Sequence, residues 1–310
     1  MTVLLKKVMV TVVTVLAFLG CSSGDDEGVV ADAAAVSADT LSLRVAVMPT
    51  MDCLPVYVAF ESGLFERDSL SVALIPFTAH MDCDTAIAGG SVHAMPTDLV
   101  RGERLVSQGT PLRYVAVTSL QWQLLTAKTA RIKKLAQMDD KMMAMTRYSA
   151  TAMMADHLVD SARLEHERVF RIQVNDVLVR LNMMENSIMD AVLLPEPLAT
   201  AARNMDCGVL YDSGADSLAM GVFAFSEKAL RDSLRRQQLE VFVRACDEAC
   251  DSINILGLKH YSHIITARCH VSEAVVDSMI AQHPPAYTHA RQPRNRDLER
   301  ARKWLSKSEK

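Results

Sequence analysis

The sequence predicts an α/β protein with a helical C-terminal part. From residue 41 onward, short apolar runs of strand-like character alternate with amphipathic runs of helical period. Such alternation is typical of sheets built from strand-helix-strand units. No strand-like run follows about Phe225, and the rest of the chain has helical patterns. With 310 residues, half of them hydrophobic, the chain is long enough for two domains with apolar cores.

The predicted elements follow these runs in chain order. Strand-like runs cover residues 42–48, 71–77, 114–120, 141–146, 169–174, 190–194 and 208–211. Helix-like runs cover 55–65, 85–88 and beyond, 97–107, 150–159, 176–186 and 196–204, and then 226–257, 260–268, 272–282 and 297–306. In the first of these helices Val56, Ala59, Phe60 and Leu64 share one face, as expected for a helix that packs on a sheet.

The N-terminal residues 1–21 have the features of a signal peptide. Two lysines precede an apolar run, residues 8–20, that is too short to span a bilayer comfortably. The Gly-Cys pair that follows resembles the lipobox of bacterial lipoproteins, so we expect lipidation at Cys21 and a lipid-anchored protein of the cell envelope. The alternative is ordinary secretion, with Cys21 lost in the cleaved peptide. Residues 22–40 are small, acidic and aperiodic, which predicts a flexible tether.

Charge and motif content exclude several classes of protein. The formal net charge is −4, so the chain has no overall electrostatic reason to bind nucleic acid. No apolar run after the leader is long enough for a membrane span. His-Glu-x-x-His, Walker and Rossmann glycine motifs are all absent from the sequence, so we expect neither an enzyme nor a bound cofactor.

Several segments of the chain resemble a known family of solute-binding proteins. The segments are Val-Met-Pro-Thr at 47–50, the helix and Gly-Leu-Phe turn at 54–66, the Ala-rich run at 82–94, the segment 135–149, and Asp-Ala-Val-Leu-Leu-Pro-Glu-Pro at 190–197. Together they resemble the sulfonate, nitrate, taurine and thiamine-pyrimidine-precursor binding proteins of ABC transporters. The resemblance covers about residues 41–211.

This resemblance implies a periplasmic-binding-protein type 2 fold, with two α/β lobes joined by two crossover strands. Lobe one is expected over residues 41–120 plus 214–310, and lobe two over residues 121–213. The lobes of such a protein close on their ligand, and a permease reads the closed form. The implied partners are a small-molecule ligand and an ABC permease with its ATPase, and the protein is expected to be a monomer.

The loops after the predicted strands are the expected ligand site, because α/β sheets bind ligands beyond the carboxyl ends of their strands. These loops hold Thr50, Asp52, Cys53, Asp82, Cys83, Asp98, Arg147, Tyr148, Ser149, Thr151 and Glu196, which are the candidate ligand-binding residues. Simpler roles remain open for three of them. The alternative role of Ser149 is that of a helix cap alone. Arg147 could instead pair with surface acids, and Glu196 could be a helix N-terminal acid.

The tripeptide Met-Asp-Cys occurs three times, at 51–53, 81–83 and 205–207. The first two copies fall in neighbouring loops, so a disulfide between Cys53 and Cys83 is the expected bridge among six cysteines after the leader. Cys246 and Cys250 stand one helical turn apart, and we expect them to be buried thiols.

The residues in these loops also suggest the class of ligand. Their charged side chains are mostly acidic, which favours a small nitrogenous ligand of the thiamine-precursor kind, and Tyr57, Trp122 and Tyr148 could stack on a flat ring. Three alternatives stay open. They are a sulfonate or nitrate ligand, a soft metal or haem bound with His80 or His93, and a sensor or adhesin that keeps this fold without transport.

Overall fold

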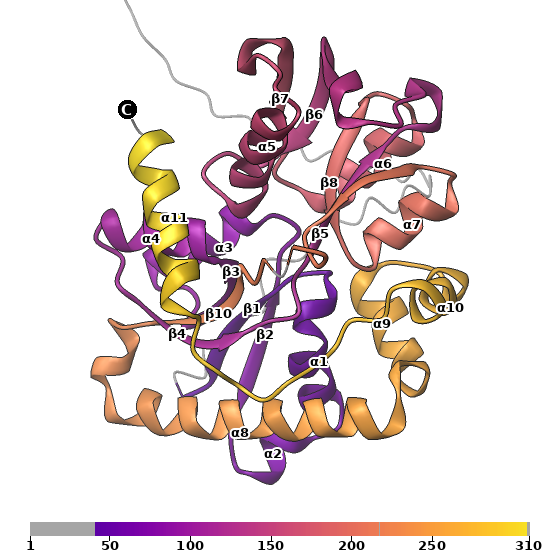
Figure 1. Ribbon diagram of the computed structural model, residues 1–310. Helices are drawn as coiled ribbons and strands as arrows, with labels where there is room; N and C mark the ends of the chain where they lie inside the picture. Colours follow the sequence, from indigo (N-terminus) through magenta and orange to yellow (C-terminus); the bar gives the residue numbers. More distant parts are fainter. Residues whose placement is uncertain (1–40, 217, 309–310) are drawn as a thin grey trace, which may run out of the picture. The chain divides into compact units, whose positions relative to one another are not determined.

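The computed structural model describes residues 41–216 and 218–308, and it contains two five-stranded sheets of mixed direction. The predictions of a signal peptide, of lipidation at Cys21 and of a tether over 22–40 lie outside these residues. Figure 1 shows the two sheets with helices packed around each of them. The fold is therefore α/β, as predicted.

The first sheet has the strand order β2-β1-β3-β10-β4. Its strands are β1 (Leu43–Val47), β2 (Val72–Pro76), β3 (Ala94–Asp98), β4 (Leu112–Val117) and β10 (Gly221–Ser226). β1 is parallel to β2 and β3, whereas β10 lies antiparallel between β3 and β4. A strand from the second half of the sequence thus completes a sheet that the first half begins.

The second sheet has the strand order β7-β6-β8-β5-β9 and repeats this plan. Its strands are β5 (Trp122–Thr126), β6 (Lys141–Met145), β7 (Val169–Gln173), β8 (Ala191–Pro195) and β9 (Gly208–Asp212). β6 is parallel to β7 and β8, and β5 lies antiparallel between β8 and β9. In each sheet the antiparallel strand is the one that the chain enters from the other sheet.

Two segments join the sheets, residues 118–121 before β5 and residues 213–220 before β10. They run close together. A side chain at Gly221 would place its Cβ 2.4 Å from Leu120 Cβ and 2.5 Å from Thr118 Oγ1, so only glycine fits there. Ser213 Oγ also accepts a hydrogen bond from Trp122 N at 2.8 Å, which ties the second segment to the start of β5.

Helices follow most strands and cover the sheets. They are α1 (Leu54–Glu61), α2 (Leu64–Arg67), α3 (His80–Gly89), α4 (Leu99–Ser107), α5 (Ala150–Ser161), α6 (Val177–Glu185), α7 (Leu198–Asn204), α8 (Ser233–Leu256), α9 (Ser262–Cys269), α10 (Glu273–Gln282) and α11 (Asn295–Ser308). α8 packs on α1 and α2, and Phe242 of α8 stacks on Phe65 of α2 with ring centroids 5.4 Å apart. α11 packs on α4.

A long segment without regular secondary structure, residues 283–294, joins α10 to α11 and is called the C-terminal connection below. In Figure 1 it crosses the molecule from α10 to α11 in front of α8. Its backbone completes the edge of the first sheet, because Val117 N donates to Arg291 O at 2.9 Å.

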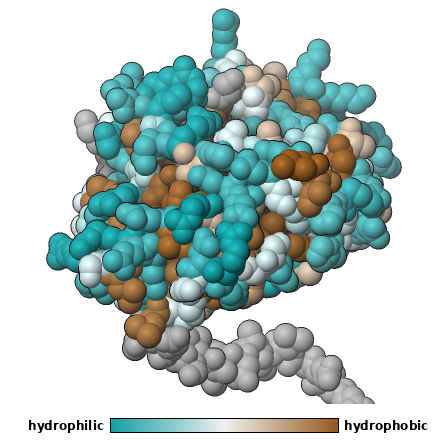
Figure 2. Space-filling view, turned by 90° about the horizontal axis from the view of Figure 1, so that it is seen from below, coloured by the Kyte–Doolittle hydropathy of each residue, from teal (hydrophilic) through white to brown (hydrophobic). Residues whose placement is uncertain are grey.

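The surface seen in Figure 2 is mostly hydrophilic, with small separate hydrophobic areas. Ile255 and Leu256, at the end of α8, are among the exposed large apolar side chains. Among the described residues, no helix is both long enough and apolar enough to cross a membrane.

The structure differs from the sequence-based prediction at three strands. β3 was not predicted, and the helix expected from residue 97 overlaps its last two residues. Asp98 caps this helix by accepting hydrogen bonds from Val100 N and Arg101 N, so α4 begins at Leu99. β5 and β10 were not predicted. Both are antiparallel strands whose neighbours lie far away in the sequence.

Candidate ligand-binding site

The carboxyl ends of the strands in the two sheets meet, and the loops beyond them are in direct contact. Thr78 Oγ1 donates to Asp176 Oδ2 at 2.5 Å, and Met51 N donates to Glu196 O at 3.0 Å. Ala150 N, at the start of α5, donates to Asp98 Oδ1 at 3.0 Å. The loops of the two sheets thus form one buried polar interface.

On the first-sheet side of this interface, several buried polar atoms lack hydrogen bonds. Over the described ranges 41–216 and 218–308, no group completes a hydrogen bond to Thr50 Oγ1, either carboxylate oxygen of Asp52, His80 Nε2, Asp84 Oδ1, Thr97 Oγ1 or Arg101 Nε. Thr97 lies near the end of β3, and the others lie in the turn after β1 or on the helices α3 and α4. Buried polar groups are almost always hydrogen-bonded, so this set indicates a place for a ligand.

The buried carboxyl group of Asp52 is one of these groups. It is 5% exposed and lies in a 3-10 turn, Met51–Cys53, between β1 and α1. Burial raises the pKa of Asp52 to about 6, and the nearby Thr50 hydroxyl opposes this rise without cancelling it. Asp52 and Glu196 line a cavity of about 20 Å³, which is room for one water-sized group.

A second group of buried charges lies around α3, α4 and α6. Arg101 pairs with Asp84, and Arg180 donates to Val174 O, Leu193 O and Thr146 Oγ1. Burial, followed by the charge of Arg101, lowers the pKa of Arg180 to about 9.

Burial of His80, together with the positive charges of Arg101 and Arg180, lowers its pKa to about 3, so this imidazole is neutral. Burial also raises the pKa of Asp98 to about 6.

The structure brings together most of the residues that the sequence suggested. Thr50, Asp52 and Cys53 lie in the turn after β1, and Asp98 reaches α5 through Ala150. Glu196 lies beyond β8, where its Oε2 accepts from Thr200 N and Thr200 Oγ1 and its Oε1 is 2.9 Å from Arg203 Nη2.

Ser149 and Thr151 have local roles. Ser149 caps α5 by accepting from Thr151 N at 3.1 Å, and its hydroxyl donates to Thr146 O at 2.6 Å. Thr151 Oγ1 accepts from Thr146 N at 3.0 Å. The simpler interpretation of Ser149 as a helix cap accounts for its contacts.

Three expected residues lie away from this interface. Asp82 is exposed on α3. Arg147 and Tyr148 line a surface groove that also includes Trp304 of α11, and the Tyr148 ring lies under the guanidinium of Arg104 at 4.4 Å. Both side chains follow β6, but the chain turns there so that they point toward α4 and α11 instead of the interface.

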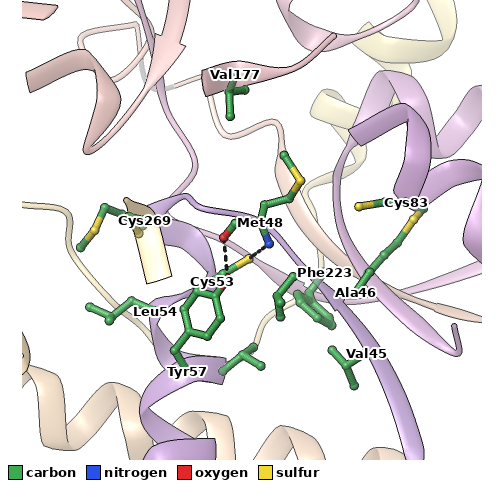
Figure 3. Packing of buried hydrophobic residues seen from close by; sticks show 14 of the residues in the cluster. Val45, Ala46, Met48, Cys53, Leu54, Tyr57, Cys83, Val177, Phe223 and Cys269 are labelled. Carbon is green, nitrogen blue, oxygen red and sulfur yellow. Dashed lines mark hydrogen bonds between the residues drawn. The ribbon is translucent and has the colours of Figure 1, made fainter. Parts of the chain in front are cut away.

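The expected stacking surface is also absent from the interface. Tyr57 is buried and donates to Met48 O at 2.9 Å, and Trp122 is part of the second apolar core. Figure 3 shows Tyr57 below Met48 in the packed interior.

The predicted disulfide between Cys53 and Cys83 is wrong in this structure, where both cysteines are buried free thiols. Cys53 Sγ accepts a hydrogen bond from Met48 N at 3.4 Å, which holds it in the turn after β1. Cys83 lies on α3, and in the view of Figure 3 Met48 lies between the two cysteines. Loops that follow neighbouring strands need not turn their side chains toward each other. Cys250 is a buried thiol, as expected, whereas Cys246 is only partly buried.

The interface also contains residues that the sequence analysis passed over. Thr97, Arg101 and Arg180 carry no motif, and His80 was considered only as a metal ligand. One signal for Arg180 was available, because it interrupts an apolar run, Val-Leu-Val-Arg-Leu, at 177–181. In the part of the chain that the structure describes, no group of three or more His, Cys, Asp or Glu side chains could hold a metal ion.

The fold and the site define a periplasmic-binding-protein type 2 architecture with a buried polar interface between two sheets. Residues 50–253 match the family model NMT1/THI5 like, and the chain belongs to this family. The resemblance drawn from the sequence is thereby confirmed.

Solved structures share the fold at low sequence identity. The alkanesulfonate-binding protein SsuA from Xanthomonas axonopodis pv. citri, bound to MOPS, is 15% identical, with a TM-score of 0.72 over 87% of this chain and 93% of that one. The periplasmic nitrate-binding protein NrtA from Synechocystis PCC 6803 is 12% identical, with a TM-score of 0.68 over 82% and 74%. The desulfurization enzyme DSZB is 12% identical, with a TM-score of 0.61 over 86% and 92%. No curated protein matches the chain.

Proposed function

We propose that this chain is an extracytoplasmic solute-binding lipoprotein, anchored through Cys21, that closes on a small nitrogenous molecule and delivers it to an ABC importer. Its partners are then the permease and the ATPase of that importer. Family membership supports a binding role, as does a fold shared with proteins named as sulfonate-binding and nitrate-binding. The fold alone does not decide against catalysis, because it is also that of a desulfurization enzyme.

The observation that carries the ligand class is the carboxylate of Asp52. A buried carboxylate without hydrogen-bond donors is costly, and a ligand that supplies N–H groups or a positive charge removes that cost. Among the described residues neither of its oxygens has a hydrogen bond. A sulfonate or nitrate placed beside Asp52 would meet a like charge instead.

Closure follows from the two segments that join the sheets. We propose that residues 41–120 with 214–310, and residues 121–213, move as two lobes about these segments. The contacts of Met51 with Glu196, Thr78 with Asp176 and Ala150 with Asp98 then close the interface. Since the cavity lined by both Asp52 and Glu196 holds only one water-sized group in this form, a ligand enters the interface when these contacts are open.

The experiment is thermal unfolding of the full chain in detergent, with aminopyrimidines, polyamines, MOPS and nitrate. A ligand at about a thousandfold above its Kd adds about 4 kcal/mol and raises the unfolding midpoint by several degrees. Asp52→Asn should abolish the shift. Asp82→Asn is the matched control, because Asp82 lies in the second copy of the Met-Asp-Cys tripeptide but is exposed. A folded, unloaded protein that responds to no compound would contradict transport and favour a sensor or adhesin.

An anionic ligand is the second candidate, and Arg180 is the observation that favours it. This arginine is buried, and the three groups to which it donates are all uncharged oxygens. A shift with MOPS or nitrate that survives Asp52→Asn would support this candidate and contradict the first.

A further inference from the structure

A second, larger cavity, of about 380 Å³, lies within the part of the fold built on the first sheet. Its walls come from β4, β10 and α8, and its roof is the C-terminal connection. One end reaches the joining segment 118–121 and Asp52. This volume is within the range of small-molecule sites in proteins.

The roof is fastened at several points. Tyr287 Oη donates to Met51 O at 2.8 Å, and Ala290 N donates to Asp247 Oδ1 at 2.7 Å. Asn254 Nδ2 donates to Tyr287 O at 3.0 Å. The connection is therefore held over the cavity by its own hydrogen bonds, and the space beneath it is part of the built structure.

The lining is more apolar than polar, and it also includes Arg291 and Arg294 of the C-terminal connection. Val117, Phe223 and Phe242 form the walls, with the thiols of Cys246 and Cys250. Burial raises the pKa of both thiols, so they are neutral and act as small apolar groups. Asp247 at one end is engaged by the roof, whereas Asp52 at the other end has no hydrogen bond from any described residue.

Asp52 lines both this cavity and the small one beside Glu196. Met51, its neighbour, connects the two regions, because its N–H donates to Glu196 O and its carbonyl accepts from Tyr287. A molecule in the larger cavity would therefore lie against the residue that links the roof to the loops of the second sheet.

We propose that this cavity binds the body of a small amphiphilic amine, with an aromatic ring or a short apolar chain beneath the C-terminal connection and the amino group at Asp52. The inference rests on the proposed function and names its class of solute. It locates the apolar body of the ligand within the first-sheet half and its amino group at Asp52, which also lines the small cavity beside Glu196 at the interface of the two sheets.

The first test measures binding of 2-phenylethylamine to the full chain in detergent by calorimetry. We expect saturable binding, at least about tenfold weaker for Asp52→Asn, since a charge-assisted hydrogen bond is lost. Asp82→Asn should bind as the unaltered protein does. 2-Phenylethanol, which keeps the ring but lacks the charge, should also bind at least about tenfold more weakly.

A cavity-filling substitution tests the location. Cys246→Phe places a ring in the cavity and should abolish binding of 2-phenylethylamine, provided that its unfolding transition shows that the variant folds. The unaltered protein gives an independent measure. Bound 2-phenylethylamine should slow alkylation of Cys246 and Cys250 by N-ethylmaleimide, measured site by site by mass spectrometry, and leave Cys207 of the second-sheet half unaffected.

The outcomes separate the two proposals. Binding that depends on Asp52 but neither protects these thiols nor responds to Cys246→Phe overturns this inference and leaves the proposed function standing. If the protein binds an aminopyrimidine but not 2-phenylethylamine, this inference is also overturned and the proposed function also stands. No response to any nitrogenous compound contradicts both.

Discussion

The loops of the two sheets meet at one interface, but their polar side chains are satisfied very differently. On the second-sheet side, Ser149 caps the helix that follows it. Arg180 donates hydrogen bonds to Val174 O, Leu193 O and Thr146 Oγ1. In the first sheet, Asp52 and Thr97 are just as buried and yet have atoms without a hydrogen bond among the described residues.

This difference indicates a division of labour. A side whose polar groups are satisfied by its own backbone and side chains is rigid and preformed, whereas a side with unsatisfied groups gains most from a ligand. Substitutions on the second-sheet side should therefore change stability, and substitutions at Asp52 should change binding.

The largest loss of stability is expected for Arg180→Met. The change leaves two buried carbonyls and a hydroxyl without their donor, so the free energy of unfolding should fall by about 3 kcal/mol. Urea unfolding measures it. Arg67→Met is the control, because Arg67 pairs with Glu248 at the surface and its loss should change stability little. An equal effect of the two substitutions would contradict the preformed role of Arg180.

In the absence of ligand, Asp52→Asn should instead raise the free energy of unfolding. The pKa of Asp52 is raised from 3.8 to about 6 in the folded protein, so its ionisation lowers stability as the pH rises through that interval. The substitution should raise the free energy of unfolding at pH 7.5 by up to about 3 kcal/mol and leave it nearly unchanged at pH 3.5.

Urea unfolding at several pH values measures this effect. The pKa of Asp98 is also raised to about 6, so the stability of the variant should still fall as the pH rises through that range. The effect of Asp52 is therefore the difference between the two proteins at each pH. A variant less stable than the unaltered protein at pH 7.5 would show that Asp52 has partners in the unliganded state.

Ser149→Ala should cost about 1 kcal/mol, the usual value of a lost helix cap. Unfolding in urea gives the stability, and calorimetry with a ligand from the panel gives the affinity. We expect the affinity to stay within about twofold once the variant is folded. A tenfold loss of affinity at nearly unchanged stability would instead place Ser149 against the ligand.

Arg147→Ala should have the smallest effect. Its side chain is exposed in the groove beside α11, so both stability and ligand affinity should remain close to those of the unaltered protein. Calorimetry with the same ligand is the measurement. A large loss of affinity would mean that the interface rearranges on binding and brings Arg147 into it.

Much of the fold could be predicted because its parallel strands are short apolar runs between helices. The predicted runs at 42–48, 71–77, 141–146 and 169–174 coincide with β1, β2, β6 and β7 to within a residue or two. β10 escaped prediction because an antiparallel strand inserted between β3 and β4 is defined by its partners and not by its own flanks.

The candidate site was only partly predictable. The rule that ligands bind beyond the carboxyl ends of strands found the loops of Thr50, Asp98 and Glu196. It could not say which side chains turn inward, so Arg147 was included, and it did not reach Arg180, which lies on helix α6. A position in a loop is a property of the local sequence, whereas the direction of a side chain depends on what packs against it.

By itself the sequence determined the α/β class, the family resemblance and the loops in which a ligand would be sought, because apolar period and turn residues act over short stretches of chain. Tertiary structure alone decided that Cys53 and Cys83 stay apart, that Asp52 is buried without a hydrogen bond from the described chain, and that a cavity remains beneath the C-terminal connection. These features depend on which distant segments come together, and no local pattern records that.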